Sequence, residues 1–406
     1  MSNPSSKIIL GLGLVLVLSF IHPGVPLAQL NVSELLATEN TSLEFSTDPL
    51  TILNLSPGSS DPHSPTITIN GQTVVITWKN AADILLMRSI DGGFNFDPPI
   101  KLANGQVPSI AIEGQNVAAL WKHEEKPGFF LSHLISFARS TDGGKTFGKP
   151  VSISKGVKKP FESSIALKGL TVIAAWDDKA GTGDIWYARS TNGGGSFSAP
   201  IRLLTENKKA FKPFVAMHGQ TAAMAWTDSK SDTTNRQVTF ARSTNGGATF
   251  SEPVTIRKGT VTRLSVDRQG ITIVFNEKKG ICKSACLIYS ADGGKTFSKP
   301  VALFNQATLP SIAIHGKSII AAWPSNSSER NMGNADIMLV HSPNRGNLFS
   351  EPINLSNSPG HSTTPAVATD GETVFVTWRE DTPTGTKTPM RSEIFLTRIA
   401  LPALAK

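Results

Sequence analysis

The chain has 406 residues, of which 39 are Lys or Arg and 31 are Asp or Glu, so its formal net charge is +8. Charged residues make up only 17% and hydrophobic residues 39% of the chain, which excludes an intrinsically disordered protein. The chain has two cysteines, which excludes a disulfide-rich scaffold, and its Cys and His spacing predicts neither a metal site nor a cofactor. The positive charge is scattered without a basic block, so nucleic acid is not an expected partner.

Residues 1–28 have the organisation of a signal peptide. Lys7 precedes a mainly apolar run of 14 residues, Ile8–Ile21, and small residues follow up to Ala28. This run is shorter than the roughly 20 residues that a membrane span needs. We therefore expect cleavage after Ala28, with an uncleaved anchor as the alternative. Residues 29–44 show no strand pattern and are expected to be a spacer. The prediction is a secreted or cell-surface protein whose mature chain does not span a membrane.

An eight-residue motif recurs through the rest of the chain. Each copy begins with Ser, has Asp or Asn at the third position and Gly at the fifth, and ends with Phe. The closing phenylalanines lie 47 to 53 residues apart, so the chain consists of nearly equal repeats. The third-position residues are Asp91, Asp142, Asn192, Asn245, Asp292 and Asn344.

Four short apolar segments accompany each copy of the motif. In the third repeat they are residues 164–167, 170–176, 184–189 and 200–204, and Gly, Pro or Asn separates them. This pattern is typical of a four-stranded antiparallel meander. The second strand ends on an aromatic residue in seven repeats, which predicts seven sheets. These aromatic residues are Trp78, Trp121, Trp176, Trp226, Phe275, Trp323 and Trp378.

The last repeat stops after its third strand, residues 393–398. Residues 45–56 resemble residues 349–356, which lead into that repeat. The N-terminal strand is therefore predicted to complete the seventh sheet. The fold class that follows is all-β, a seven-bladed β-propeller of four-stranded antiparallel blades over residues 45–400, with residues 401–406 as a C-terminal tail.

The repeated motif resembles the Asp-box, or bacterial neuraminidase repeat, of sialidase-like propellers, and the resemblance covers nearly the whole mature chain. In physical terms, the Asp or Asn side chain can accept backbone N–H groups of the turn between the third and fourth strands, and Gly tolerates the positive φ of that turn. The Phe is expected to pack between neighbouring sheets. Because one active site does not need six copies, we interpret the motif as structural. An Arg that ends the third strand in five blades is interpreted in the same way, at Arg88, Arg139, Arg189, Arg242 and Arg398.

Function is expected in residues that differ between blades. The inner strands of three consecutive blades begin near Glu162, Lys212 and Arg263. Because inner strands begin around the propeller axis, these side chains are predicted to form a patch that binds an anion or a sugar. The alternative is a solvated rim with one or two salt bridges.

The loops after the second strands are acidic. Asp177, Asp178 and Asp228 are further candidates at the same mouth of the propeller. Two such carboxylates at a suitable separation can act as acid and base on a glycoside, although acidic hairpin tips are ordinarily only solvated. The stretch 177–184 has oxygen ligands for a calcium ion but does not follow the EF-hand pattern.

Sialidases, which the repeat resembles, hold the substrate carboxylate with three arginines and use a Tyr nucleophile. The first of those arginines lies in a Phe/Tyr-Arg-Ile-Pro motif, which is absent here. The only tyrosines, Tyr187 and Tyr289, lie on third strands, away from the expected mouth. Catalytic residues are therefore not assigned.

Three functions follow from these patterns. The first is a non-catalytic module that binds a glycan, a cell-envelope component or a protein. The second is an exo-acting glycoside hydrolase that uses acidic mouth residues, and the third is an assembly factor that binds proteins. Cys282 and Cys286 lie in the fifth repeat and are expected to form a small disulfide, with free thiols as the alternative.

Overall fold

The fold is taken from a computed structural model, which describes residues 43–44, 51–125, 132–178, 183–203, 209–229, 235–277, 285–304, 310–325, 335–383 and 390–404. The predicted signal peptide, residues 1–28, lies outside these ranges, as does the spacer apart from residues 43–44. Within the ranges, no helix has the length and hydropathy of a membrane span.

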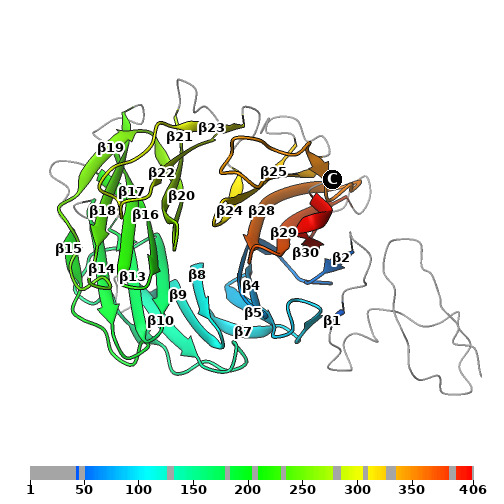
Figure 1. The fold of residues 1–406 in the computed structure, drawn as a ribbon. Helices are drawn as coiled ribbons and strands as arrows, with labels where there is room; N and C mark the ends of the chain where they lie inside the picture. The colour runs from blue at the N-terminus through cyan, green and yellow to red at the C-terminus, as the bar shows by residue number, and fades with distance from the viewer. Residues whose placement is uncertain are drawn as a thin grey trace, which may run out of the picture.

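Seven four-stranded antiparallel sheets surround a central axis, as the sequence predicts (Figure 1). The strands of blades 1 to 3 are β3 (Pro62–Asn70), β4 (Thr73–Asn80), β5 (Asp83–Ser89) and β7 (Ile100–Asn104); β8 (Gln106–Glu113), β9 (Asn116–Glu125), β10 (Ser132–Ser140) and β11 (Val151–Ser152); and β12 (Ser163–Lys168), β13 (Thr171–Asp177), β14 (Ile185–Ser190) and β15 (Ile201–Leu203). Those of blades 4 and 5 are β16 (Lys209–His218), β17 (Thr221–Ser229), β18 (Arg236–Ser243) and β19 (Val254–Lys258); and β20 (Thr260–Asp267), β21 (Gly270–Asn276), β22 (Ala285–Ser290) and β23 (Val301–Phe304). Those of blades 6 and 7 are β24 (Ser311–His315), β25 (Ser318–Pro324), β26 (Ile337–Ser342) and β27 (Ile353–Asn354); and β28 (His361–Thr369), β29 (Thr373–Thr382), β30 (Arg391–Ala400) and β2 (Ile52–Asn54).

The N-terminal strand completes the seventh blade, which confirms the predicted ring closure. β2 pairs antiparallel with β30, in the register Leu53 to Leu396. Two short elements were not expected from the sequence. β1 (Leu43–Glu44) pairs with β6 (Asn95–Phe96), and Leu401–Leu404 in the predicted tail form a 3-10 helix.

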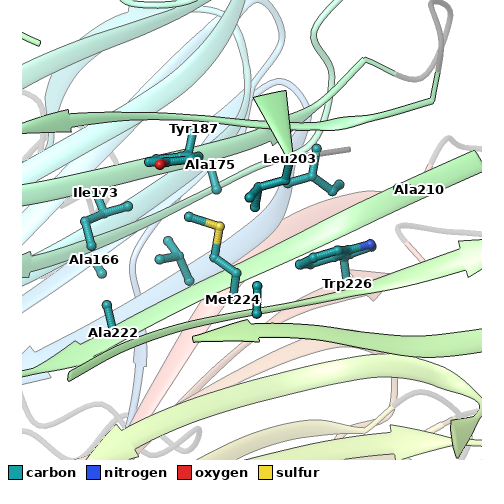
Figure 2. Packing of buried hydrophobic residues seen from close by; sticks show 12 residues of the cluster. Ala166, Ile173, Ala175, Tyr187, Leu203, Ala210, Ala222, Met224 and Trp226 are labelled. Atoms are coloured by element: carbon teal, nitrogen blue, oxygen red, sulfur yellow. The ribbon is translucent and has the colours of Figure 1, made fainter. Parts of the chain in front are cut away.

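The hydrophobic core lies between adjacent blades. Figure 2 shows the cluster between blades 3 and 4, where Met224 and the fully buried Trp226 of β17 pack with side chains of β13 and β14. Alanines such as Ala175 and Ala222 in this cluster let the two sheets approach closely. Each blade therefore buries its faces against its neighbours, which explains why the sheets stack radially.

The recurring turn has the same hydrogen bonds in all six copies. The Ser hydroxyl donates to Oδ1 of the third-position Asp or Asn over 2.6–3.0 Å, and it accepts the N–H of the fifth-position Gly over 2.7–2.9 Å. At Asp292, the backbone N–H and the hydroxyl of Thr296 and the hydroxyl of Ser290 hold the pKa of the carboxyl well below its usual range. These bonds stabilise the turn itself.

Two kinds of side chain link each turn to the neighbouring blade. The closing Phe197 meets Phe137 of the preceding blade edge-to-face, with ring centroids 4.8 Å apart, which confirms the predicted packing between sheets. Arg189 donates from Nε to the carbonyl of Gly246 in the next blade over 2.7 Å, and Arg398 donates to Gly92 over 3.1 Å, across the closure of the ring. Arg88, which donates to the carbonyl of Asp142, Arg189 and Arg398 thus connect neighbouring blades.

In blade 6 the position of that Arg holds His341, which predicts a pH-dependent stability. The side chain is 4% exposed, its Nε2 lies 3.0 Å from Ser318 Oγ, and desolvation lowers its pKa. A histidine whose pKa is lowered by folding binds fewer protons in the native state. Its stabilising contribution is therefore complete above about pH 6.5, the ordinary histidine pKa, and is lost as the pH falls below it.

We expect the free energy of unfolding of the wild type to fall more between pH 7 and pH 5 than that of His341→Gln, in urea titrations at each pH. The same loss in both proteins would contradict a role for His341.

Candidate functional site

The first strand of each blade lies next to the central channel of the propeller, and several of these inner strands are irregular near their first residues. The register shifts within β3, β8, β16, β20 and β28. Within three of these shifts a non-glycine residue with positive φ precedes a proline, at Ser64 (53°), Lys212 (54°) and Thr364 (47°). A left-handed residue costs about 1–2 kcal/mol, and such strain concentrates at functional sites. The strained backbone therefore marks the mouth of the channel as a candidate site.

A pocket of about 510 Å³ opens in the channel. The inner strands β8, β12, β16 and β20 line it, together with Thr68 of β3. Its lining includes Glu162, Lys212 and Arg263, so the structure brings together the three residues predicted to meet at the axis. Its volume lies within the range of about 300–1,000 Å³ that is common for small-molecule sites.

Glu162 and Lys212 lie on adjacent blades and form a loose ion pair. Lys212 Nζ is 3.9 Å from Glu162 Oε1. The Lys212 side chain is 52% exposed and the Glu162 side chain 26%. An exposed pair at this distance contributes about 0–1 kcal/mol to stability, so a ligand can displace the lysine at low cost.

Arg263 is the distinctive cation of the pocket. Solvent reaches its side chain, but the surrounding inner strands desolvate it and lower the pKa of its guanidinium. An arginine nevertheless stays charged at neutral pH. Among the described residues, none forms a hydrogen bond or ion pair with this guanidinium. Its five N–H donors are thus available to an anionic ligand in the channel.

Asp177 lies behind the pocket wall and holds it in place. Its side chain is 0% exposed, and Oδ2 accepts the backbone N–H of Lys212 over 3.0 Å, while Oδ1 lies 3.4 Å from the N–H of Glu162. The carboxylate therefore joins the end of β13 to the left-handed bulge of β16. The sequence predicts Asp177 at the mouth of the propeller. In the structure Asp177 does not line the pocket, but its carboxylate holds the backbone of two residues that do, Lys212 and Glu162.

Asp178 and Asp228 do not meet the other candidates in the pocket. Asp178 accepts the N–H of Asp184 over 2.8 Å, and Asp228 accepts Trp226 Nε1 over 2.9 Å. Both carboxylates are buried: Asp178 bridges the two ends of the loop that follows β13, whereas Asp228 also accepts the hydroxyl of Thr239 in the adjacent strand β18. In the stretch considered for calcium, Asp184 forms an ion pair with Arg202 over 2.5 Å, and residues 179–182 lie outside the described ranges.

Among the described residues, no group of three or more His, Cys, Asp or Glu side chains is placed to hold a metal ion. Cys286 is buried in β22 and disulfide-bonded. Cys282 lies outside the described residues, so the pairing of the two cysteines stays a prediction.

Sequence reasoning missed a second pocket of about 320 Å³ between blades 1 and 2. Its lining residues are His63, Ser64, Thr66, Lys79, Gln106 and Pro108. The Ser64-Pro65 pair, which matches Lys212-Pro213 in the sequence, was the available signal for it.

No family model and no curated protein matches this chain. Solved structures do resemble it. Polysaccharide lyase Uly1 has a TM-score of 0.57 and 11% identity over 89% of this chain and 99% of its own. A PL25 ulvan lyase has a TM-score of 0.57 and 10% identity over 87% and 98%. The Hadza microbial sialidase Hz136 has a TM-score of 0.49 and 13% identity over 82% and 75%. The likeness to the two lyases, at these identities, shows a shared fold.

Proposed function

We propose that this chain is an exported carbohydrate-binding propeller that holds an anionic glycan in the channel pocket without turning it over. The observation that carries the proposal is the Arg263 guanidinium, a cation without a partner among the described residues, in a pocket of ligand size. Lys212 adds a second positive charge, whereas Glu162 supplies one negative charge, so the three charged side chains sum to a net positive charge.

The polar lining suits a sugar. Thr68, Ser109 and Ser265, whose side chains carry hydroxyl groups, line the same pocket as the two cations. Such groups donate to and accept from sugar hydroxyls, while the guanidinium binds a carboxylate or sulfate in a bidentate manner. Two of the solved structures with this fold are polysaccharide lyases by name, in keeping with a carbohydrate ligand.

Binding is favoured over hydrolysis because Glu162 is the single carboxylate among the described residues that line the pocket. Glycoside hydrolysis usually requires two carboxylates on opposite sides of the bond. The nearby Asp177 accepts backbone N–H groups and is fully buried, so it does not face the ligand space. The organisation of residues 1–28 supports export to the cell surface or the medium as part of this proposal.

Arg263→Gln is expected to weaken binding of tetragalacturonate about tenfold or more, because a hydrogen bond to a charged group contributes about 1.5–3 kcal/mol. Isothermal titration calorimetry of the mature chain measures this effect. The matched control is Arg268→Gln, an exposed arginine in the turn between β20 and β21, which should leave the affinity unchanged.

Incubation of the wild type with polygalacturonate should release neither reducing ends nor unsaturated uronates. Turnover would replace the binding function with an enzymatic one. Equal affinity of Arg263→Gln and wild type would remove the channel pocket as the site.

A further inference from the structure

The second pocket lies at the same end of the channel as the first. Ser64 in β3 and Lys212 in β16 both have a left-handed backbone, both precede a proline and both lie within a register shift of an inner strand. They are therefore equivalent positions of blades 1 and 4. Ser64 lines the second pocket and Lys212 lines the first.

Two strands run from one pocket into the other. On β3, Thr66 lines the second pocket and Thr68, two residues further along the same strand face, lines the first. On β8, Gln106 lines the second pocket, Ser109 lines the first, and Pro108 belongs to both. The two pockets thus share the buried Pro108 as part of their lining, so they lie next to each other.

The chemistry of the second pocket is also suited to an anion. Lys79 is half-buried, and no described carboxylate pairs with it. His63, its cross-strand partner, has Nδ1 3.0 Å from the carbonyl of Asp61, and a carbonyl can only accept. In the neutral imidazole Nδ1 therefore carries the proton, and Nε2, which has no partner among the described residues, is an acceptor that suits a sugar hydroxyl, so the positive charge of this pocket comes from Lys79. Asp61, whose carboxylate lies 3.8 Å from His63 Nδ1, does not line the pocket.

We propose that the second pocket is a subsite for another acidic residue of the same glycan, so that the ligand is an oligosaccharide with at least two anionic sugars that spans both pockets. This inference rests on the proposed function and adds the length and charge of the ligand. Lys79 contacts the second anionic group, while Arg263 contacts the first. The hydroxyls of Ser64 and Thr66 and the amide of Gln106 bond to sugar hydroxyls.

The test compares galacturonate with tetragalacturonate by isothermal titration calorimetry. Wild type should bind the tetramer at least about tenfold more tightly than the monomer. Lys79→Gln should weaken the tetramer about three- to tenfold and leave the monomer within about twofold, since one charge-assisted contact is lost. Gln106→Ala, which retains the charge of the pocket, should weaken the tetramer in the same selective way. Lys145→Gln, at an exposed turn of blade 2, is the matched charge control.

The outcomes separate the two proposals. If wild type binds neither ligand, the proposed function fails and the subsite with it. If wild type binds both ligands equally and Lys79→Gln changes nothing, the subsite alone is refuted. Tetraglutamate bound as tightly as tetragalacturonate would overturn the carbohydrate class of the ligand and favour an acidic peptide.

Discussion

Replacing Asp177 with Ala is expected to lower the free energy of unfolding by about 2–5 kcal/mol and to weaken ligand binding in the channel, because two backbone donors lose a buried acceptor. The carboxylate is 0% exposed and bonds to the N–H of Lys212 over 3.0 Å. Without it, the left-handed conformation of Lys212, with φ of 54°, loses its support from blade 3. The lost hydrogen bond joins blades 3 and 4, so the Asp177→Ala substitution lowers the stability of the protein and also alters the shape of the pocket.

Urea denaturation of Asp177→Ala and wild type measures the stability change. Asp177→Asn keeps one oxygen acceptor and should lose less than the Ala variant. Glu252→Ala is the control, because Glu252 is exposed at an outer edge of blade 4 and should change stability by no more than about 0.5 kcal/mol. If Asp177→Ala behaves like this control, the positioning role of Asp177 is excluded.

Gly194→Ala is expected to lower the free energy of unfolding by about 2–5 kcal/mol, as the sum of backbone strain and overpacking. Gly194 has a φ of 91°, and an added Cβ would overlap the Phe137 ring of the preceding blade. The Phe137 ring also packs against the Phe197 ring, with the two ring centroids 4.8 Å apart, so it has little freedom to move away from the added Cβ. The substitution therefore strains the turn and forces two blades apart.

Gly169→Ala separates the two causes. Gly169 lies in the same blade and has a φ of 57°, but nothing lies within 4 Å of an added Cβ. This variant should lose only about 1–2 kcal/mol, the cost of the left-handed backbone. Thermal or urea unfolding of both variants gives the difference, which measures the contact between blades. Equal losses would show that the close approach to Phe137 does not matter.

Much of the fold could be predicted because its determinants are local and repeated. The period of about 50 residues gives the blade count, and the turn motif recurs because Ser and Asp bond to N–H groups within four residues. The similarity of residues 45–56 to residues 349–356 predicted the pairing of β2 with β30. The meeting of Glu162, Lys212 and Arg263 followed from the equivalent starts of three inner strands.

The roles of the acidic residues could not be predicted in this way. Asp177 and Asp178 are adjacent in the sequence, yet one supports the bulge of the next blade and the other supports its own loop. The second pocket likewise depends on how blade 1 packs against blade 2.

The sequence by itself therefore determined the all-β repeat architecture, the closure of the ring and which blades carry charge at the axis, since short-range hydrogen bonds and strand periodicity encode these features. Only the tertiary structure decided which carboxylates are buried, which cation lacks a described partner and where two pockets lie next to each other. These properties depend on contacts between strands and between blades, as between Asp177 and Lys212, which are 35 positions apart in the chain, and no local pattern specifies them.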